Sequence, residues 1–134
     1  LNDVETKISF IKQDFFDLQP AACSLQPKSF DFVVSNPPYI PTQEIETLQP
    51  EVRYEPHMAL DGGKDGLDFY RRIIDKTHHY LRKDGFLIME MGFNQKEAIK
   101  NIFQKSGYFE IIEFVKDYNN MDRVIIAKKR ERNG

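Results

Sequence analysis

Two adjacent prolines directly after an apolar run place the strongest constraint on how this chain can fold. The run Phe30–Ser35 predicts a buried strand, and Asn36, Pro37, Pro38 and Tyr39 follow it. Each proline fixes its own φ near about −65° and removes a backbone N–H, and the first also moves the residue before it out of the helical region. We therefore expect a rigid corner at the carboxyl end of a strand, where open α/β sheets bind ligands. A turn without a binding role is the alternative, because Asn before Pro commonly opens a turn.

Length, composition and charge describe one globular domain, or part of one, from a reducing compartment. The 134 residues are 40% hydrophobic and 30% charged, which are the proportions of a folded chain rather than a disordered one. A formal net charge of −2 disfavours nucleic acid as a partner. The single cysteine, Cys23, excludes an internal disulfide and fits the cytoplasm, and no apolar run has the length of a membrane span. The chain has no signal-peptide pattern and does not begin with Met, so we expect its gene to start upstream.

Strand and helix patterns alternate along the chain and predict an α/β sheet. The expected strands are residues 7–13, Phe30–Ser35, 86–89, Phe109–Lys116 and 123–129. Two helices are expected, with Asp65 and Asn94 as their N-caps and with Asp84-Gly85 and Gly107 at their ends. Only six residues separate the last two strands, too few for a crossover helix, so we expect that pair to be antiparallel.

Several short segments together match a known family. They are Asp14-Phe15-Phe16, residues 34–40, 51–56, 59–60, 62–67 and 85–90, Gly92, and Asp122-Arg123-Val124. On these segments, which extend from about residue 8 to residue 128, the chain resembles the S-adenosylmethionine-dependent methyltransferases that modify a glutamine amide in peptide-chain release factors, the PrmC/HemK type. Asn-Pro-Pro-Tyr alone is shared with enzymes that methylate the amino group of adenine. The segment from residue 53 to residue 56, with the Ala-Leu pair and the glycines after it, is narrower and points to the glutamine group.

The resemblance implies a partial Rossmann-like methyltransferase sheet, mostly parallel and with an antiparallel hairpin at its C-terminal end. The family's strand order is similar to 3-2-1-4-5-7-6, and this chain would keep strands 3, 4, 5, 6 and 7. Strand 4 would then expose an unpaired apolar edge, which is a liability. We expect either that residues 7–13 pair with Phe30–Ser35 or that two chains pair with each other at this edge.

The family's glycine-rich cofactor loop and its N-terminal helical substrate domain have no counterpart in this sequence. The resemblance therefore identifies residues 1–134 as the C-terminal portion of a methyltransferase catalytic domain. Gly62, Gly63 and Gly66 follow a loop rather than a strand, so they are not the missing cofactor loop. We expect S-adenosylmethionine to bind this chain weakly or not at all, and the chain alone to be inactive.

The corner suits an NH2 group on an sp2 carbon, whose nitrogen is a poor nucleophile that a protein can orient. The Asn36 side-chain oxygen and the Pro37 carbonyl would each accept one N–H, and both bonds would strengthen as positive charge grows on the nitrogen. Tyr39 would cover the planar amide. Asn36, Pro37 and Tyr39 are the expected catalytic residues, and together with Pro38 they form the expected substrate-binding site. The same groups would serve an adenine flipped out of a duplex.

The resemblance also implies where the cofactor would contact this chain. It places Asp14 or Phe15, at the end of the first expected strand, at the family's adenine-contacting positions, and Asn36 beside them as a third cofactor-binding residue. The alternatives are a turn residue at Asp14 and a core aromatic residue at Phe15.

Other polar residues give weaker indications. Arg53 and Glu55 would brace the substrate loop or form a surface ion pair of little energetic consequence. Glu90 ends an apolar strand, where a structural hydrogen bond is favoured over a catalytic role because a buried carboxylate needs a partner. The three histidines lack the spacing of metal ligands and no Cys/His cluster exists, so we expect no metal site.

The resemblance predicts methylation of a glutamine side-chain amide in a release factor, with the glutamine-containing loop of that factor as the partner. Two alternatives stay open, which are a nucleic-acid adenine amino-methyltransferase and a catalytically inactive fragment. A cytoplasmic protein without a membrane partner is expected in each case.

Overall fold

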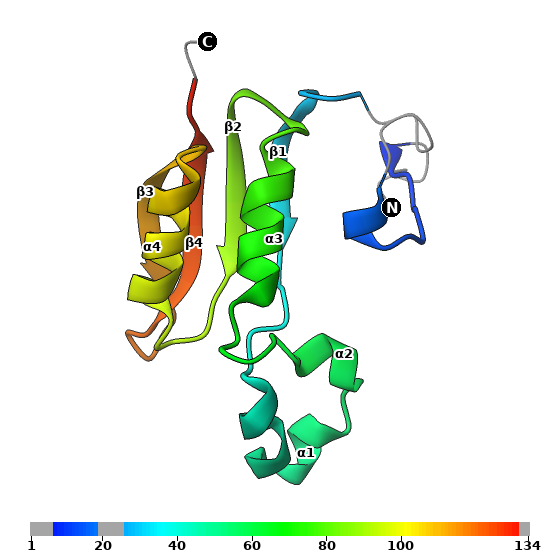
Figure 1. Cartoon of the computed structure of the whole chain (residues 1–134), viewed down its shortest axis with the longest axis vertical. Coiled ribbons are helices and arrows are strands. Elements are labelled where there is room, and N and C mark those ends of the chain that lie inside the picture. Colours follow the sequence, from blue (N-terminus) through cyan, green and yellow to red (C-terminus); the bar gives the residue numbers. More distant parts are fainter. Residues whose placement is uncertain (1–6, 19–25, 132–134) are drawn as a thin grey trace.

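The computed structural model describes residues 7–18 and 26–131, which contain one four-stranded sheet (Figure 1). Its strands are β1 (Phe30–Ser35), β2 (Leu81–Glu90), β3 (Phe109–Lys116) and β4 (Asp122–Lys129), in the spatial order β1-β2-β4-β3. This order matches strands 4-5-7-6 of the arrangement expected from the sequence. The α/β class and the antiparallel C-terminal hairpin are confirmed.

The sheet is mixed rather than mostly parallel, which corrects one detail of the predicted fold. β1 and β2 pair in parallel, whereas β4 is antiparallel to both β2 and β3. The physical reason is the position of β4. Since β4 lies between β2 and β3 and runs against both, it leaves only one parallel pairing in a sheet whose other three strands share a direction.

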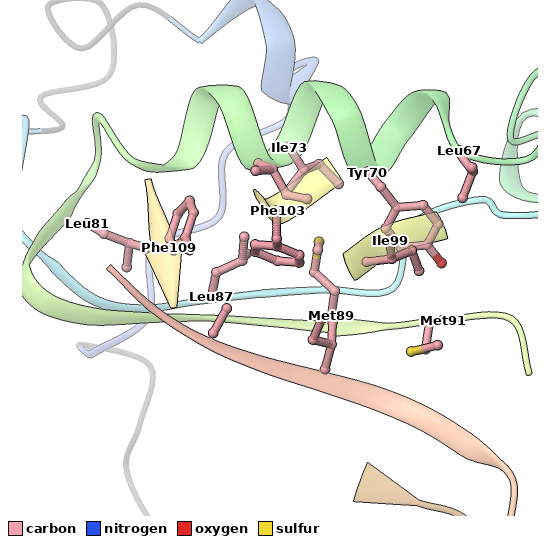
Figure 2. Packing of buried hydrophobic residues seen from close by; sticks show 13 residues of the cluster. Leu67, Tyr70, Ile73, Leu81, Leu87, Met89, Met91, Ile99, Phe103 and Phe109 are labelled. Carbon is pink, nitrogen blue, oxygen red and sulfur yellow. The ribbon is translucent and has the colours of Figure 1, made fainter. Parts of the chain in front are cut away.

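Two helices, α3 (Asp68–Thr77) and α4 (Lys96–Ser106), cover one face of the sheet (Figure 1). The buried side of α3 consists of Tyr70, Ile73, Ile74 and Thr77, which is the helical spacing predicted from the sequence. Figure 2 shows Tyr70 and Ile73 above Leu87 and Met89 of β2, in one contiguous core. In the described part of the chain, no helix has the length and apolarity that crossing a membrane requires.

The helix starts differ from the predicted caps, whereas the end of α4 agrees with the sequence. The N-cap of α3 is Leu67, and Asp65 instead accepts a hydrogen bond from the Leu67 backbone N–H at 3.1 Å. The N-cap of α4 is Gln95 rather than Asn94. Gly107 closes α4 in the left-handed region with a φ of 67°, as predicted.

β2 begins earlier than the apolar run at residues 86–89 indicated. α3 ends at Thr77, and β2 already pairs with β1 at Leu81, opposite Phe30. Asp84 and Gly85 therefore lie inside β2 and do not end the helix, because the chain enters the sheet before it reaches them.

The predicted strand at residues 7–13 is wrong. This segment pairs with no strand among the described residues, and Figure 1 shows it apart from the sheet, leading into the 3-10 helix η2 (Phe15–Asp17). Its apolar side chains are exposed, with Phe10 at 92%. Alternating apolar residues make a strand only where a neighbour satisfies the backbone groups. The expected pairing of residues 7–13 with Phe30–Ser35 is therefore also wrong, and Cys23 lies outside the described residues.

Between β1 and α3 the chain projects beyond the carboxyl end of β1 (Figure 1). This projection, residues 41–61, contains the 3-10 helix η3 (Thr42–Thr47) and the one-turn helices α1 (Pro50–Arg53) and α2 (His57–Leu60). A parallel bridge between Ile40 and Asp61 closes it at its base. The corner at residues 36–39 is thus the point where the chain leaves the sheet and enters the projection.

Candidate functional site

The corner at residues 36–39 follows the last residue of β1. Asn36 is exposed, Pro37 is buried, and Pro38 and Tyr39 are half-buried. Among the described residues, the Asn36 carboxamide has no hydrogen-bond partner. Because the two prolines have no backbone N–H, the corner presents carbonyl oxygens and one unengaged side-chain amide.

Both ends of the corner are fixed by backbone pairing. On the upstream side, Ser35 pairs with Met89 of the neighbouring strand β2. On the downstream side, the Ile40 N–H donates to the Leu60 carbonyl at 3.0 Å, and the Ile40 carbonyl accepts from the Gly62 N–H at 2.8 Å. The residues between these anchors are therefore held in one place by their neighbours and by the fixed φ angles of the prolines.

A pocket of about 880 Å³ opens beside the corner and collects most of the predicted site residues. Asp14 and Phe15 line it together with Asn36, Pro37 and Pro38. Residues from η2, from β1 and from the corner thus meet at one place although about twenty residues separate them in the sequence.

Asp14 and Phe15 have local structural roles in addition to their place on the pocket wall. Asp14 Oδ1 accepts from the Phe16 backbone N–H at 2.8 Å and so caps η2. The Phe15 ring packs edge-on against Phe16 with 5.4 Å between centroids, and the Arg72 guanidinium lies 3.6 Å from the Phe16 centroid. The pocket lining thus combines three phenylalanine rings and several aliphatic side chains with the charged groups of Lys12, Asp14 and Arg72.

Tyr39 does not line this pocket. Its hydroxyl donates to Glu90 Oε1 at 3.5 Å, and its ring edge lies close to Gly92 on the other side of the corner. Burial, followed by the nearby Glu90 carboxylate, raises the pKa of the Tyr39 hydroxyl. The ring is thus held as a neutral phenol against the end of β2.

Glu90 makes the structural contacts favoured by the sequence. Its backbone carbonyl accepts from the Tyr70 hydroxyl at 3.1 Å, and its side chain is the partner of Tyr39. Burial raises the pKa of Tyr70, so this phenol also stays neutral and keeps its donor proton. Through Tyr70, α3 is tied to the end of β2 directly below the corner.

The remaining polar candidates do not join the pocket. Arg53 and Glu55 are both exposed, and no ion pair joins them in the described part of the chain. His57 pairs with Asp61 at 3.7 Å, and the His78 ring stacks on Tyr108 with 3.6 Å between centroids. Residues 7–18 and 26–131 contain no group of three or more side chains able to hold a metal ion.

Sequence reasoning missed two residues that shape the site. Arg72, on the exposed side of α3, reaches the aromatic wall of the pocket, and Gln95, at the start of α4, donates to the Tyr39 carbonyl at 2.9 Å. Neither carries a signal in the sequence, because an arginine in a helix and a polar residue before a helix are both ordinary surface features.

A family model supports the identification of this chain as a methyltransferase. The model for Eco57I restriction-modification methylase matches residues 1–120, nearly the whole chain. A solved protein-(glutamine-N5) methyltransferase (release factor-specific) from Alicyclobacillus acidocaldarius aligns with 76% of this chain and 50% of its own, at 28% identity and a TM-score of 0.47.

Curated relatives carry a more specific description. A release factor glutamine methyltransferase from Thermodesulfovibrio yellowstonii is 43% identical over 130 residues, which cover 96% of this chain and 44% of the relative. One from Geobacter sulfurreducens is 50% identical over 97 residues, which cover 72% of this chain and 34% of the relative. The chain thus spans less than half the length of these relatives. It belongs to the methylase family that the Eco57I model describes, and it is a part-length homologue of the release factor glutamine methyltransferases.

Proposed function

We propose that the natural protein containing this chain transfers a methyl group to the side-chain amide nitrogen of a glutamine in a peptide-chain release factor. The observation that carries this proposal is the free carboxamide of Asn36, exposed at the end of β1 on the wall of the 880 Å³ pocket. The names of the curated relatives supply the acceptor, since they are release factor glutamine methyltransferases. The glutamine-containing segment of the release factor is accordingly the proposed partner.

The corner would hold the acceptor NH2 group by accepting both of its hydrogens. Asn36 Oδ1 accepts one hydrogen and the Pro37 carbonyl accepts the other, which fixes the direction of the nitrogen lone pair. As the nitrogen forms its new bond it gains positive charge, so both hydrogen bonds strengthen toward the transition state. Because the prolines fix the backbone, the acceptors need no rearrangement at that moment. Covering the amide with the Tyr39 ring would require that ring to leave Glu90.

The family implies S-adenosylmethionine as methyl donor, a cofactor that supplies a methyl group activated by a sulfonium. The pocket wall fits such a molecule, since Phe15 offers an aromatic face and Asp14 uses only Oδ1 in capping η2, which leaves its other oxygen available. We propose that Asp14, Phe15 and Asn36 contact the cofactor. In the described residues no glycine-rich turn joins a strand to a helix, so we propose that these 134 residues alone bind it weakly and are inactive. Micromolar affinity in a calorimetric titration of the chain would contradict this part.

Adenine amino-methylation is the second candidate function, and one observation favours it. The family model that matches the chain describes a restriction-modification methylase. An adenine amino group is also an NH2 on an sp2 carbon, so the same corner would hold it. The net charge of −2 weighs only mildly for the protein acceptor, because the chain spans less than half of its relatives and the rest of the natural protein could supply a basic surface.

We also propose that the free edge of β1 is a site of self-association in the isolated chain. β1 is the last strand of the described sheet, and Phe32 and Val34 on it are 58% and 72% exposed. An edge of this kind pairs readily with a second strand. Sedimentation at several concentrations tests this, and a monomer at the highest concentration would oppose it.

The experiment that tests the main function offers the natural protein two kinds of acceptor. Purified protein with radiolabelled S-adenosylmethionine is given a peptide-chain release factor, the same factor with its acceptor glutamine replaced, and adenine-containing DNA. Label in the first factor alone supports the proposal, and mass spectrometry of its peptides identifies the modified side chain. Label in the DNA with none in the factor would replace it with the second candidate.

A further inference from the structure

Gln95 joins three turns that lie far apart in the sequence. Its side chain is buried, with 9% exposed. Nε2 donates to the Tyr39 carbonyl at 2.9 Å and to the Gly66 carbonyl at 3.2 Å, and Oε1 accepts from the Gly92 N–H at 3.2 Å. These partners belong to the corner after β1, to the glycine turn before α3 and to the turn after β2. One amide therefore satisfies buried backbone groups from three separate segments.

Glycines at two of these positions make the close approach possible. A Cβ at Gly66 would lie 2.4 Å from the Tyr39 carbonyl oxygen and 2.8 Å from Gln95 Nε2. A Cβ at Gly92 would lie 2.8 Å from Gln95 Oε1. A side chain at either position would displace the Gln95 amide, so both glycines and the glutamine form one arrangement around the Tyr39 carbonyl.

The Gln95 backbone is fixed by the start of α4. Its N–H donates to the Gly92 carbonyl at 3.1 Å, and its carbonyl accepts from the Ile99 N–H at 2.9 Å. Ile99 is fully buried in the core beneath α4. The Gln95 amide is thus anchored to a packed helix and not to a loop.

We propose that Gln95 is a positioning residue that sets the location of the corner through the Tyr39 carbonyl. The inference rests on the proposed function, in which Asn36 and Pro37 hold the acceptor amide. Pro37 and Pro38 remove two φ rotations between Tyr39 and Asn36, so fewer rotations can absorb a shift of the Tyr39 carbonyl before it reaches the Pro37 carbonyl. A fixed Tyr39 carbonyl therefore keeps the Pro37 carbonyl and the backbone that carries the Asn36 side chain at the same place from one turnover to the next.

The test compares two substitutions at Gln95 with the same substitutions at an exposed glutamine of the same helix. Gln95→Met keeps the length of the side chain but removes all three hydrogen bonds, whereas Gln95→Glu keeps the size and removes the two donated ones. Gln104, exposed on α4, provides the controls Gln104→Met and Gln104→Glu. All variants are made in the natural protein that contains this chain.

Two measurements separate positioning from simple stabilisation. The first is steady-state methyl transfer per folded enzyme, where kcat should fall about tenfold to 100-fold, as expected for misplacement on the scale of 1 Å. KM for S-adenosylmethionine should change less than kcat, because Asn36 is the one proposed cofactor contact that belongs to the corner, whereas Asp14 and Phe15 lie outside it. The second is hydrogen exchange of the Ile40 amide, which is bonded to Leu60 next to the corner and which should speed up in Gln95→Met at least about tenfold more than the buried Ile74 amide inside α3. The Gln104 variants should change neither.

Unchanged kcat per folded enzyme together with unchanged Ile40 exchange in Gln95→Met would overturn the inference. Should Gln95→Met not fold, the same outcome in Gln95→Glu would overturn it. If the natural protein methylates no release factor, the proposed function fails, and the exchange of Ile40 still decides whether Gln95 fixes the corner.

Discussion

Two side-chain amides lie at the corner, Asn36 at its start and Gln95 against the carbonyl of its last residue, Tyr39, and they differ in burial and in hydrogen bonding. Gln95 is buried and uses its amide in three hydrogen bonds to backbone groups. Asn36 is exposed, and its amide has no partner among the described residues. A satisfied amide contributes to structure, whereas an unsatisfied one on a constrained backbone is available to a ligand. The corner is therefore bonded at the Tyr39 carbonyl to a buried amide, while the amide at its other end stays exposed and unengaged.

Removing the Asn36 amide should have the largest effect on activity and leave stability unchanged. In Asn36→Ala we expect methyl transfer to fall by about 10²–10³-fold, or about 2.7–4 kcal/mol, as for the loss of one hydrogen-bonding group at a developing charge. The melting temperature should not fall, because the side chain holds nothing in place. Activity assays and thermal unfolding of the natural protein measure both, and Asn101→Ala on the exposed side of α4 is the control. A marked loss of stability in Asn36→Ala would remove the contrast with Gln95.

The buried amide should show the reverse pattern in stability. In Gln95→Met the Tyr39 and Gly66 carbonyls lose their donor, so we expect the free energy of unfolding to fall by about 1–3 kcal/mol. Denaturant titration with Gln104→Met as the matched control measures this difference. Equal stability of the two variants would mean that Gln95 is replaceable by any side chain of its length.

The pH dependence of unfolding should report on Tyr70, the buried phenol that bonds the end of β2. Burial raises the pKa of Tyr70 above its ordinary value of 10.0. The folded chain therefore keeps a proton that the unfolded chain loses, so the stability is complete below about pH 10 and falls by up to about 1.4 kcal/mol per pH unit above it. Tyr70→Phe should flatten this alkaline slope, whereas the exposed Tyr118→Phe should not. Identical slopes in denaturant titrations from pH 9 to 11 would show that Tyr70 does not titrate differently in the two states.

The smallest effect on stability is expected at the open edge of the sheet, on β1, which also borders the pocket. Val34, 72% exposed on β1, should tolerate Val34→Lys with a change in unfolding free energy within about 0.5 kcal/mol. The same change should reduce any association of the isolated chain, because lysine blunts sheet edges. Sedimentation and denaturant titration test the two parts, and a loss of stability as large as that of Gln95→Met would mean that this face packs on something in the folded protein.

Local patterns in the sequence predicted the elements whose neighbours are also local. α3 follows from the spacing of Tyr70, Ile73, Ile74 and Thr77, and the β3–β4 hairpin follows from the six residues between its expected strands. Residues 7–13 have the same kind of apolar pattern, yet they form no strand, because a strand depends on a partner that its own residues do not specify. The helix starts were misplaced for a related reason, since Asp65 bonds Leu67 and Arg71 instead of capping α3.

The exposed part of the candidate site consists of contiguous residues that the sequence singles out, whereas the buried contacts around it could not be predicted from the sequence. Asn36 and the prolines are contiguous, and their stiffness follows from their chemistry alone. The structural role of Gln95 depends on its hydrogen bonds to Tyr39, Gly66 and Gly92, which lie up to 56 residues away in the sequence. The position of the Tyr39 ring could likewise not be predicted from the sequence, because it depends on a hydrogen bond to Glu90 at the end of another strand. Contacts between distant segments are the part of a site that only the folded chain discloses.

The absence of backbone N–H groups at Pro37 and Pro38 has a consequence for discrimination between acceptors. The backbone of the corner offers only lone pairs there, so it attracts a group that brings two hydrogens and repels a group that brings negative charge. Glutamine and glutamate have nearly the same shape and differ in this respect alone. We expect a release factor carrying glutamate in place of its acceptor glutamine to compete poorly for the natural protein, and equal inhibition by both forms in a competition assay would contradict this. Because Pro37 and Pro38 have no backbone N–H to donate to a carboxylate, the corner would bind the deamidated acceptor poorly.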